Sequence, residues 1–296
     1  MKQSNTLPFV VVPCLLILLS IIAYCSILNR WNFERSAYLI FVFTTIYILL
    51  FERIIPLKQT WRAKKQDLGI DFKHLLFSAI LFDALGKAMA LSLVLYLQPF
   101  LSITEHLWDG LPFLFTFVIA NLIGEFLPYW YHRVSHVGNA DSWLSSFLWK
   151  IHAIHHLPKL LNWFKTSWIH PINILLNTFL KMFPLLILGF SQEIIFLVGV
   201  LHVVVAYLSH ANIQTKTGFL DYLIVTPQIH HFHHSKDLEE AQNFGNILPF
   251  WDLIFGTYYN RKGAVEEVGV VESDLEYPQQ ESYLPQLTFP FKEKDR

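Results

Sequence analysis

Long apolar runs separated by short polar segments dominate the pattern of residues along the chain. The first run, residues 8–28, is uninterrupted and long enough for a helix to cross the roughly 30 Å of hydrocarbon in a bilayer. Three further runs of this kind follow at residues 38–56, 74–98 and 111–131. We expect these four runs to be full transmembrane helices.

Two more apolar runs, residues 172–190 and 193–209, form a pair. Lys181 lies near the middle of the first, and a charged side chain in hydrocarbon is costly. The pair is therefore either a helical hairpin that re-enters the membrane or two more spans. Since 53% of the residues are hydrophobic and only 15% are charged, the composition agrees with the pattern. Both predict an all-α integral membrane protein with several spans.

The polar loop at residues 53–73 predicts the orientation. It carries six basic residues against few acidic ones, and loops of this kind face the cytoplasm by the positive-inside rule. Counting segments from this loop places residues 132–170 and the residues after 209 on the same side. We therefore expect a cytoplasmic helical cap and cytoplasmic termini, in a bacterial inner membrane or the endoplasmic reticulum.

Three histidine-rich motifs, called here the histidine boxes, fall in this cap. Residues three and four apart share one face of a helix, so each box points two or three imidazoles in one direction. Eight such imidazoles are more than a single metal centre uses, which favours two metals. His231 lies off this face, and we expect it to be structural. The eight are His132 and His136 in the first box, His152, His155 and His156 in the second, and His230, His233 and His234 in the third.

Polar residues inside the apolar runs also need partners. Glu125 lies seven residues before His132, on the same helical stripe. We expect its carboxylate to accept a proton from the non-ligating nitrogen of His132 or of a neighbouring imidazole; the alternative is a purely structural partner. Asp83 and Lys87, four residues apart, are expected to neutralise each other.

Aromatic residues crowd the segment between the fourth and fifth apolar runs. They are expected to anchor the cap at the membrane surface, where indole and phenyl rings are favoured; the alternative is that they line a tunnel for lipid. They are Trp143, Trp149, Trp163, Phe164 and Trp168.

Other partners are limited by what the sequence lacks. The net charge is −1, and no basic tract is interleaved with aromatic residues, so nucleic acid is not an expected partner. The chain has no glycine-rich nucleotide fingerprint and no P-loop. Electrons for a redox reaction must therefore come from another protein.

The boxes and their surroundings resemble a known family. The segments that carry the resemblance are YWYHRVSH (129–136), FLWKIHAIHH (147–156), SWIHPINILL (167–176), SHAN (209–212), TPQIHHFHHSKD (226–237) and NFGNILPFWDLIFGTYY (243–259). In this order they are similar to the landmarks of the fatty acid hydroxylase and sterol desaturase superfamily of membrane di-iron oxygenases. The resemblance covers roughly residues 110–260.

The resemblance implies a ligand set at the matching positions. The eight box histidines would bind metal, and His210, in Ser-His-Ala-Asn, would be a ninth ligand. His170 would be either a tenth ligand or a group that supports one. The superfamily often has Asp where this chain has Glu125. The implied cofactor is a pair of iron ions, for which zinc can substitute.

The family also implies the reaction. Its members hydroxylate or desaturate fatty acyl chains, sterols, alkylglycerols, carotenoids and other lipids with dioxygen and two external electrons. The implied donor is a cytochrome b5 or ferredoxin system with its reductase. The alternative from the residues alone is a metal transporter or other histidine-rich metal-binding membrane protein. Because a transporter places its ligands near the bilayer midplane and these boxes lie at helix ends, the sequence favours the enzyme.

The chain divides into three expected parts. Residues 1–110 would hold the N-terminal transmembrane helices and the basic loop, residues 111–260 a catalytic domain of the fatty acid hydroxylase type, and residues 261–296 a polar C-terminal tail.

Overall fold

The computed structural model describes residues 6–100, 107–137, 142–271 and 276–292. Within these ranges the chain is helical or irregular and forms no β-sheet. Its β-type pairing consists of two isolated bridges, Pro56 with Ile213 and Ser235 with Val268. Five helical segments are long and apolar enough to cross a membrane: α1 (Leu7–Leu28), α2 (Phe33–Ile54), the continuous Leu68–Phe100, α5 (Phe113–Val137) and α8 (Gln192–Ser209). The expected all-α, multi-pass membrane fold is confirmed.

The remaining elements are shorter. The third long segment consists of α3 (Leu68–Lys73), a π-helical stretch η2 (His74–Ile80), α4 (Leu81–Leu97) and η3 (Gln98–Phe100). The helices outside the five long segments are η1 (Gln59–Trp61), α6 (Trp143–His156), η4 (Trp163–Ser167), α7 (Pro171–Ile187), η5 (Gly218–Tyr222), α9 (Pro227–His233), α10 (Phe250–Phe255), α11 (Tyr283–Thr288) and η6 (Phe289–Phe291).

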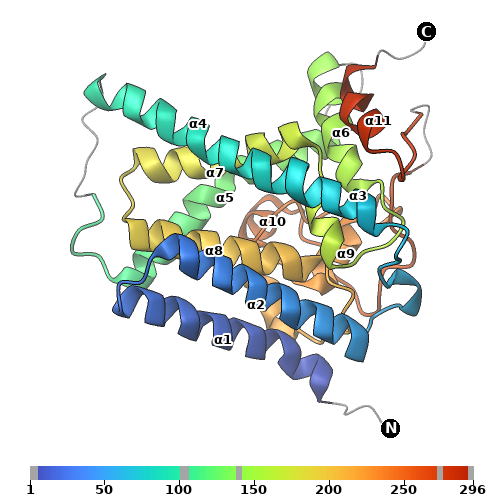
Figure 1. Cartoon of the computed structure of the whole chain (residues 1–296), viewed down its shortest axis with the longest axis horizontal. Helices are drawn as coiled ribbons and strands as arrows, with labels where there is room; N and C mark the ends of the chain where they lie inside the picture. Colours follow the sequence, from blue (N-terminus) through green and yellow to red (C-terminus); the bar gives the residue numbers. More distant parts are fainter. Residues whose placement is uncertain (1–5, 101–106, 138–141, 272–275, 293–296) are drawn as a thin grey trace.

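The long helices run across the molecule in roughly one direction (Figure 1). The turns that join α1 to α2 and α7 to α8 lie at the left-hand end of that view, whereas α6, α9, α11 and the start of α1 lie toward the right. The histidine boxes therefore share one end of the bundle, as the segment count predicts. That this end faces the cytoplasm stays a prediction from the basic loop.

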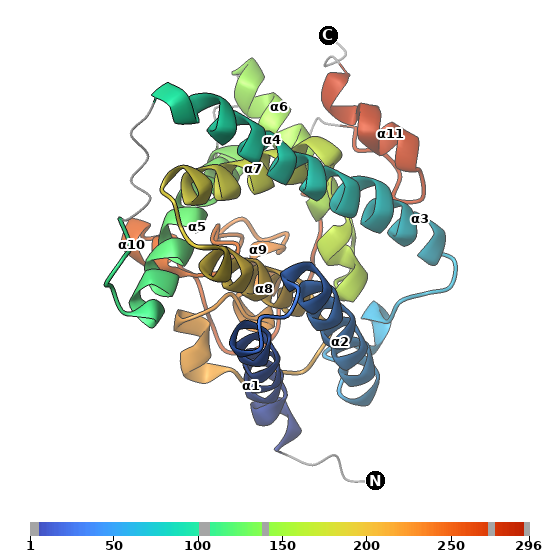
Figure 2. The same cartoon turned by 60° about the vertical axis from the view of Figure 1, so that its left-hand side comes forward.

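Helices α4 and α7 lie side by side and form one wall of the bundle, while α1, α2 and α8 pack on the opposite side (Figure 2). Gly86 lets α4 approach α7 closely, because a Cβ atom there would lie 2.8 Å from the backbone oxygen of Leu175. Small residues allow such close helix contacts in membranes, where packing is the main source of association.

The pair of apolar runs that contains Lys181 forms α7 and α8. The 17 residues of α7 extend about 26 Å at 1.5 Å per residue, which is slightly less than the hydrocarbon thickness. Lys181 is buried, and its ammonium lies 3.1 Å from the Glu125 carboxylate on α5. Asp83 and Lys87 form the expected ion pair at 2.6 Å. Paired charges thus explain how these helices carry ionised residues.

The aromatic segment after α5 does not lie wholly at a surface. Trp143 is 77% exposed, but Trp163, Phe164 and Trp168 are buried. Trp163 and Phe164 belong to the core that α1, α2 and α8 share, and Trp168 stacks on His74 with ring centroids 4.7 Å apart. The expectation of interface anchoring is therefore wrong for these three, because tertiary packing gives them apolar partners that the sequence alone does not reveal.

Part of the expected polar tail packs on η2 and on α6, the helix that carries the second box. Gln286 of α11 is fully buried, and its Oε1 lies 2.8 Å from His74 Nε2. Lys150 of α6 donates to the carbonyl of Lys292 at 2.6 Å. Residues 276–292 therefore form a cover over η2 and α6.

Candidate metal centre

Four helix ends deliver the predicted ligands to one place. His132 and His136 lie in the last turns of α5, and the second box forms the end of α6. His210 is the residue that ends α8, and the third box occupies α9 and the residue after it. Because these four helix ends meet, their imidazoles lie close together in one largely buried region.

The structure gathers the nine predicted histidines into two groups, and in each group the ligand-capable nitrogens all lie within 4.8 Å of one another. The five-histidine group consists of His132, His136, His152, His156 and His233. The four-histidine group consists of His155, His210, His230 and His234. The second and third boxes contribute to both groups, and the rings of His156 and His234 lie 4.3 Å apart, so the groups adjoin.

Hydrogen bonds fix the ring orientation in the five-histidine group. The Nδ1 atom of His132 donates to the carbonyl of Phe244 at 2.7 Å, and that of His233 donates to the carbonyl of Gln242 at 2.8 Å. The Nδ1 atom of His152 donates to a side-chain amide oxygen of α7 at 3.1 Å. A neutral imidazole carries one ring proton, so each of these rings presents an unprotonated Nε2 to the group.

The four-histidine group is oriented in the same way by other segments. His155 Nδ1 donates to the carbonyl of Trp168 at 3.0 Å. His210 Nδ1 donates to the carbonyl of Ala206, one turn earlier in α8, also at 3.0 Å. Backbone carbonyls thus select the tautomer that leaves Nε2 free to bind metal in both groups.

The unprotonated nitrogens point at one another. In the five-histidine group, Nε2 of His152 lies 3.0 Å from Nε2 of His132 and 3.0 Å from Nε2 of His156. The Nε2 atoms of His136 and His233 are buried without a hydrogen-bond partner. Facing lone pairs and unpartnered buried nitrogens are costly unless a cation binds among them. The arrangement therefore fits a metal ion.

The four-histidine group shows the same feature. A chain of Nε2 contacts links His155 to His210 at 3.1 Å, His210 to His230 at 3.0 Å and His230 to His234 at 3.2 Å. All four residues are buried. Each group thus offers an imidazole-only donor set, which suits iron and zinc among the divalent metals.

Burial keeps these imidazoles neutral at physiological pH. It lowers the pKa of His155 to about 4, although the hydrogen bond to Trp168 acts in the opposite direction. Burial and then the neighbouring imidazoles lower the pKa of the other ligands outside the membrane-spanning helices well below its usual value. These are His152, His156, His210, His230, His233 and His234. The neutral ring is the form that binds metal.

Glu125 lies in a different environment from the one expected. Its Oε2 accepts the backbone N–H of Ile247 at 3.0 Å, and its Oε1 lies 3.1 Å from the ammonium of Lys181. The proton acceptor of His132 is the Phe244 carbonyl. The expectation that Glu125 accepts from a ligand imidazole is thus corrected. Its buried carboxylate forms an ion pair with Lys181, which faces it from α7. Residue spacing along the chain does not indicate such a pair between separate helices.

Four described histidines lie outside the two groups: His74, His170, His202 and His231. His170 begins α7: its Nδ1 accepts the N–H of Ile172 at 3.1 Å, and its Nε2 donates to the Leu287 carbonyl at 3.1 Å, so both nitrogens are used. His231 packs against Trp61, with ring centroids 5.5 Å apart, and is structural as expected. Sequence reasoning missed His74, which is fully buried beneath α11, because a lone histidine has no spacing signal.

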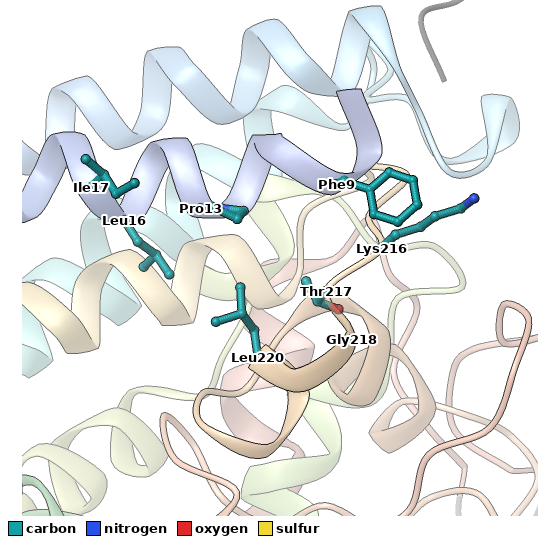
Figure 3. Close-up of a pocket in the computed structure, with 8 residues that line it drawn as sticks. All are labelled: Phe9, Pro13, Leu16, Ile17, Lys216, Thr217, Gly218 and Leu220. Atoms are coloured by element: carbon teal, nitrogen blue, oxygen red, sulfur yellow. The ribbon is translucent and has the colours of Figure 1, made fainter. Parts of the chain in front are cut away.

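An apolar pocket of about 630 Å³ lies between α1 and η5 (Figure 3). Phe9 and Leu16 of α1 line one side and Leu220 lines the other, and the Lys216 ammonium lies 4.8 Å from the centroid of the Phe9 ring. No histidine of the two groups lines it. The pocket is therefore separate from the candidate metal centre.

Comparisons with known proteins agree with this geometry. Residues 117–257, which hold all nine histidines, match the family described as Fatty acid hydroxylase. The ornithine lipid hydroxylase OlsE of Rhizobium tropici is 31% identical over 263 residues, covering 87% of this chain and 76% of that protein. The alkylglycerol monooxygenase of Danio rerio is 26% identical over 167 residues, covering 53% of this chain and 35% of that protein.

A very-long-chain aldehyde decarbonylase of Oryza sativa subsp. japonica is 29% identical over 148 residues, covering 45% of this chain and 21% of that protein. The chain thus spans about a third or less of the last two relatives. No solved structure matches it.

Proposed function

The chain belongs to the fatty acid hydroxylase family and is an oxygen-dependent, lipid-modifying oxidoreductase. From this premise we propose that two iron ions, one in each histidine group, oxidise a carbon–hydrogen bond of a membrane lipid. The observation that supports the proposal best is the pair of adjoining groups with facing, unprotonated Nε2 atoms. The metal-transporter alternative has no support from the relatives, which are named as enzymes.

Bound iron supplies the redox chemistry by which dioxygen oxidises an unactivated carbon. In hydroxylation one C–H bond and the O–O bond break, a C–O bond forms, and the second oxygen atom leaves as water. In desaturation two hydrogen atoms leave the lipid and both oxygen atoms leave as water. Each outcome consumes two electrons and two protons, which we assign to a cytochrome b5 or ferredoxin system with its reductase. The names of the relatives favour hydroxylation.

The chain itself orients the ligands and excludes water. Backbone carbonyls such as those of Phe244 and Trp168 hold the imidazoles in the metal-binding tautomer, and burial removes solvent that would quench a reactive oxidant. Because the ligands lie at the ends of membrane helices, we propose that a lipid reaches them laterally from the leaflet at that end. The similarity to the ornithine lipid hydroxylase OlsE, over 87% of this chain, makes ornithine lipids the first substrate to test.

The test combines metal analysis with isotope incorporation. The full chain is expressed in a bacterium that makes ornithine lipid but lacks an ornithine lipid hydroxylase of its own, and the cells are grown under ¹⁸O₂. The expected result is about two metal ions per purified chain and one ¹⁸O atom in a lipid alcohol. His155→Ala removes a proposed ligand and should abolish the labelled product. His170→Asn is the matched control: it replaces an equally buried histidine with a residue that can still cap α7.

Two outcomes would contradict the proposal. A metal content near zero after anaerobic reconstitution with ferrous iron would exclude the dinuclear site. Labelled lipid that persists in the His155→Ala strain would show that another enzyme makes it.

A further inference from the structure

A short segment after the third histidine box lies directly against the five-histidine group. This segment, Gln242–Gly245, is called here the 242–245 bridge. The carbonyl of Gln242 accepts from His233 Nδ1 at 2.8 Å, and the carbonyl of Phe244 accepts from His132 Nδ1 at 2.7 Å. Two carbonyls of the bridge thus orient two of the five imidazoles.

The N–H groups of the same peptide units point the other way. In a trans peptide the C=O and the following N–H are antiparallel. The N–H of Asn243 donates to the backbone carbonyl of Thr257 at 3.0 Å. The N–H of Gly245 donates to Asp252 Oδ2 at 2.8 Å, and the N–H of Phe244 donates to Asp252 Oδ1 at 2.7 Å. The Gln242–Asn243 and Phe244–Gly245 peptide units therefore each link an imidazole on one side to residues 252–257 on the other.

Two residues make this arrangement specific to the sequence. Asn243 adopts a left-handed conformation, with φ of 63°, which Asn tolerates better than most residues. Its side chain is held at both ends, because Nδ2 donates to the carbonyls of Ile229 and Tyr259 and Oδ1 accepts the N–H of Tyr259. At Gly245 a Cβ atom would lie 2.4 Å from a backbone oxygen and 2.8 Å from Asp252 Oδ2. Only glycine allows the backbone to approach the carboxylate this closely.

Asp252 is the carboxylate that accepts the N–H groups of Phe244 and Gly245. It is fully buried, and besides the two N–H groups its Oδ1 accepts the hydroxyl of Thr257 at 2.7 Å. The hydroxyl of Tyr129 lies 2.9 Å from that of Thr257 and receives a hydrogen bond from Arg133 at 3.2 Å. Burial raises the pKa of Asp252 to about 6, against the opposing effects of these hydrogen bonds and of the Arg133 charge. The three hydrogen bonds that it accepts, from the N–H groups of Phe244 and Gly245 and the hydroxyl of Thr257, stabilise the ionised carboxylate.

We propose that Asp252 is a positioning residue for the five-histidine group, acting on His132 through the Phe244–Gly245 peptide and so strengthening metal binding in that group alone. A carboxylate that binds the N–H of a peptide polarises its carbonyl, which then accepts a proton more strongly from the imidazole behind it. In the four-histidine group, the carbonyls that orient His155 and His210 belong to Trp168 and Ala206, which lie outside the bridge. The inference rests on the proposed metal site.

The test measures metal affinity instead of activity. Zn²⁺ is titrated into the purified full chain against a competing chelator, so that each tight site yields a dissociation constant. Substituting Asp252→Asn should weaken one site by up to about 10-fold and leave the other unchanged. The loss stays below the roughly 10- to 100-fold seen when the direct partner of a ligand is removed, because the Phe244 carbonyl remains in place. Thr257→Val, which removes only the hydroxyl that donates to Asp252, should give a smaller loss at the same site.

Ligand variants identify the affected site. His155→Ala disables the four-histidine group, and in that background Asp252→Asn should weaken the remaining site. His152→Ala disables the five-histidine group, and in that background Asp252→Asn should have no effect.

Glu52→Gln provides a matched control. Glu52 is also buried and accepts two backbone N–H groups, from Trp163 at 2.8 Å and Asn212 at 2.9 Å. Neither Trp163 nor Asn212 is a proposed ligand or supplies a carbonyl that orients one. Glu52→Gln should therefore reduce thermal stability without changing either zinc affinity.

The outcomes separate this inference from the proposed function. A wild-type chain that binds no zinc would refute the metal site itself. A wild-type chain with two sites, together with an Asp252→Asn affinity that is unchanged in the His155→Ala background, would refute the inference alone. If Asp252→Asn does not fold, Thr257→Val decides: an unchanged affinity overturns the role of Asp252, and a selective loss supports it.

Discussion

The ion pair between Lys181 and Glu125 gives a prediction about stability. The two groups are 3.1 Å apart and both are buried. At an effective dielectric constant of about 20, opposite unit charges at that distance attract by about 5 kcal/mol. Lys181→Met removes the cation and leaves the carboxylate with only the N–H of Ile247 as a partner. Breaking a buried pair in this way typically costs about 3–5 kcal/mol.

The expected loss is therefore large enough to measure by thermal unfolding in detergent. At about 2–4 °C per kcal/mol, the midpoint should fall by on the order of 10 °C. The double variant Lys181→Met with Glu125→Gln removes both charges and keeps an acceptor for Ile247, so it should recover most of the stability. Lys236→Met serves as the control, because its pair with Glu267 is largely exposed and should contribute less than about 1 kcal/mol.

Two results would refute this reasoning. Lys181→Met could melt at the wild-type temperature, which would mean that the pair does not compensate the burial of Glu125. Alternatively, the double variant could be as unstable as the single one, which would assign the loss to the missing Lys181 side chain and its contact with His202.

Three further predictions test the packing, the ligand set and the topology. Gly86→Ala should destabilise the fold by about 1–3 kcal/mol, because its Cβ atom would lie 2.8 Å from a backbone oxygen of α7. Gly199→Ala is the control and should not destabilise it, because a Cβ atom there meets nothing within 4 Å. Equal melting temperatures of the two variants would contradict the close α4–α7 contact. His170→Asn should retain both metals by elemental analysis, since both ring nitrogens already have partners, and the loss of one metal would identify it as a tenth ligand. Single cysteines at the exposed residues Leu144 and Leu238, in a cysteine-free background, should react with an impermeant maleimide only from the cytoplasmic side; labelling from opposite sides would exclude one shared site.

The ligand histidines are the part of the site that the sequence predicts best. Their spacings of three and four residues are local properties of a helix, so they imply a shared face wherever the helix lies. The division into two groups is different. His155 separates from His152 and His156 although all three belong to one box, because the packing of separate helices decides which ring faces which partner.

Pairings between distant segments could not be predicted from spacing. Glu125 was expected to support His132, but the helix that faces it supplies Lys181 instead. The carbonyl that supports His132 belongs to Phe244, and a backbone carbonyl has no residue signature in a sequence. The burial of Trp163 likewise depends on α2 and α8, which lie far from it along the chain.

The sequence by itself therefore determined the properties that depend on local pattern: the apolar runs set the membrane class, and the histidine boxes set the kind of metal donor. Only the tertiary structure decided which imidazoles share a metal, which carbonyls orient them and which charges neutralise one another. The physical reason is the separation along the chain between the residues that set each property. Helix periodicity and hydrophobic length are fixed within a few turns of chain, whereas partners such as Asp252 and the bridge before it depend on how separate elements pack.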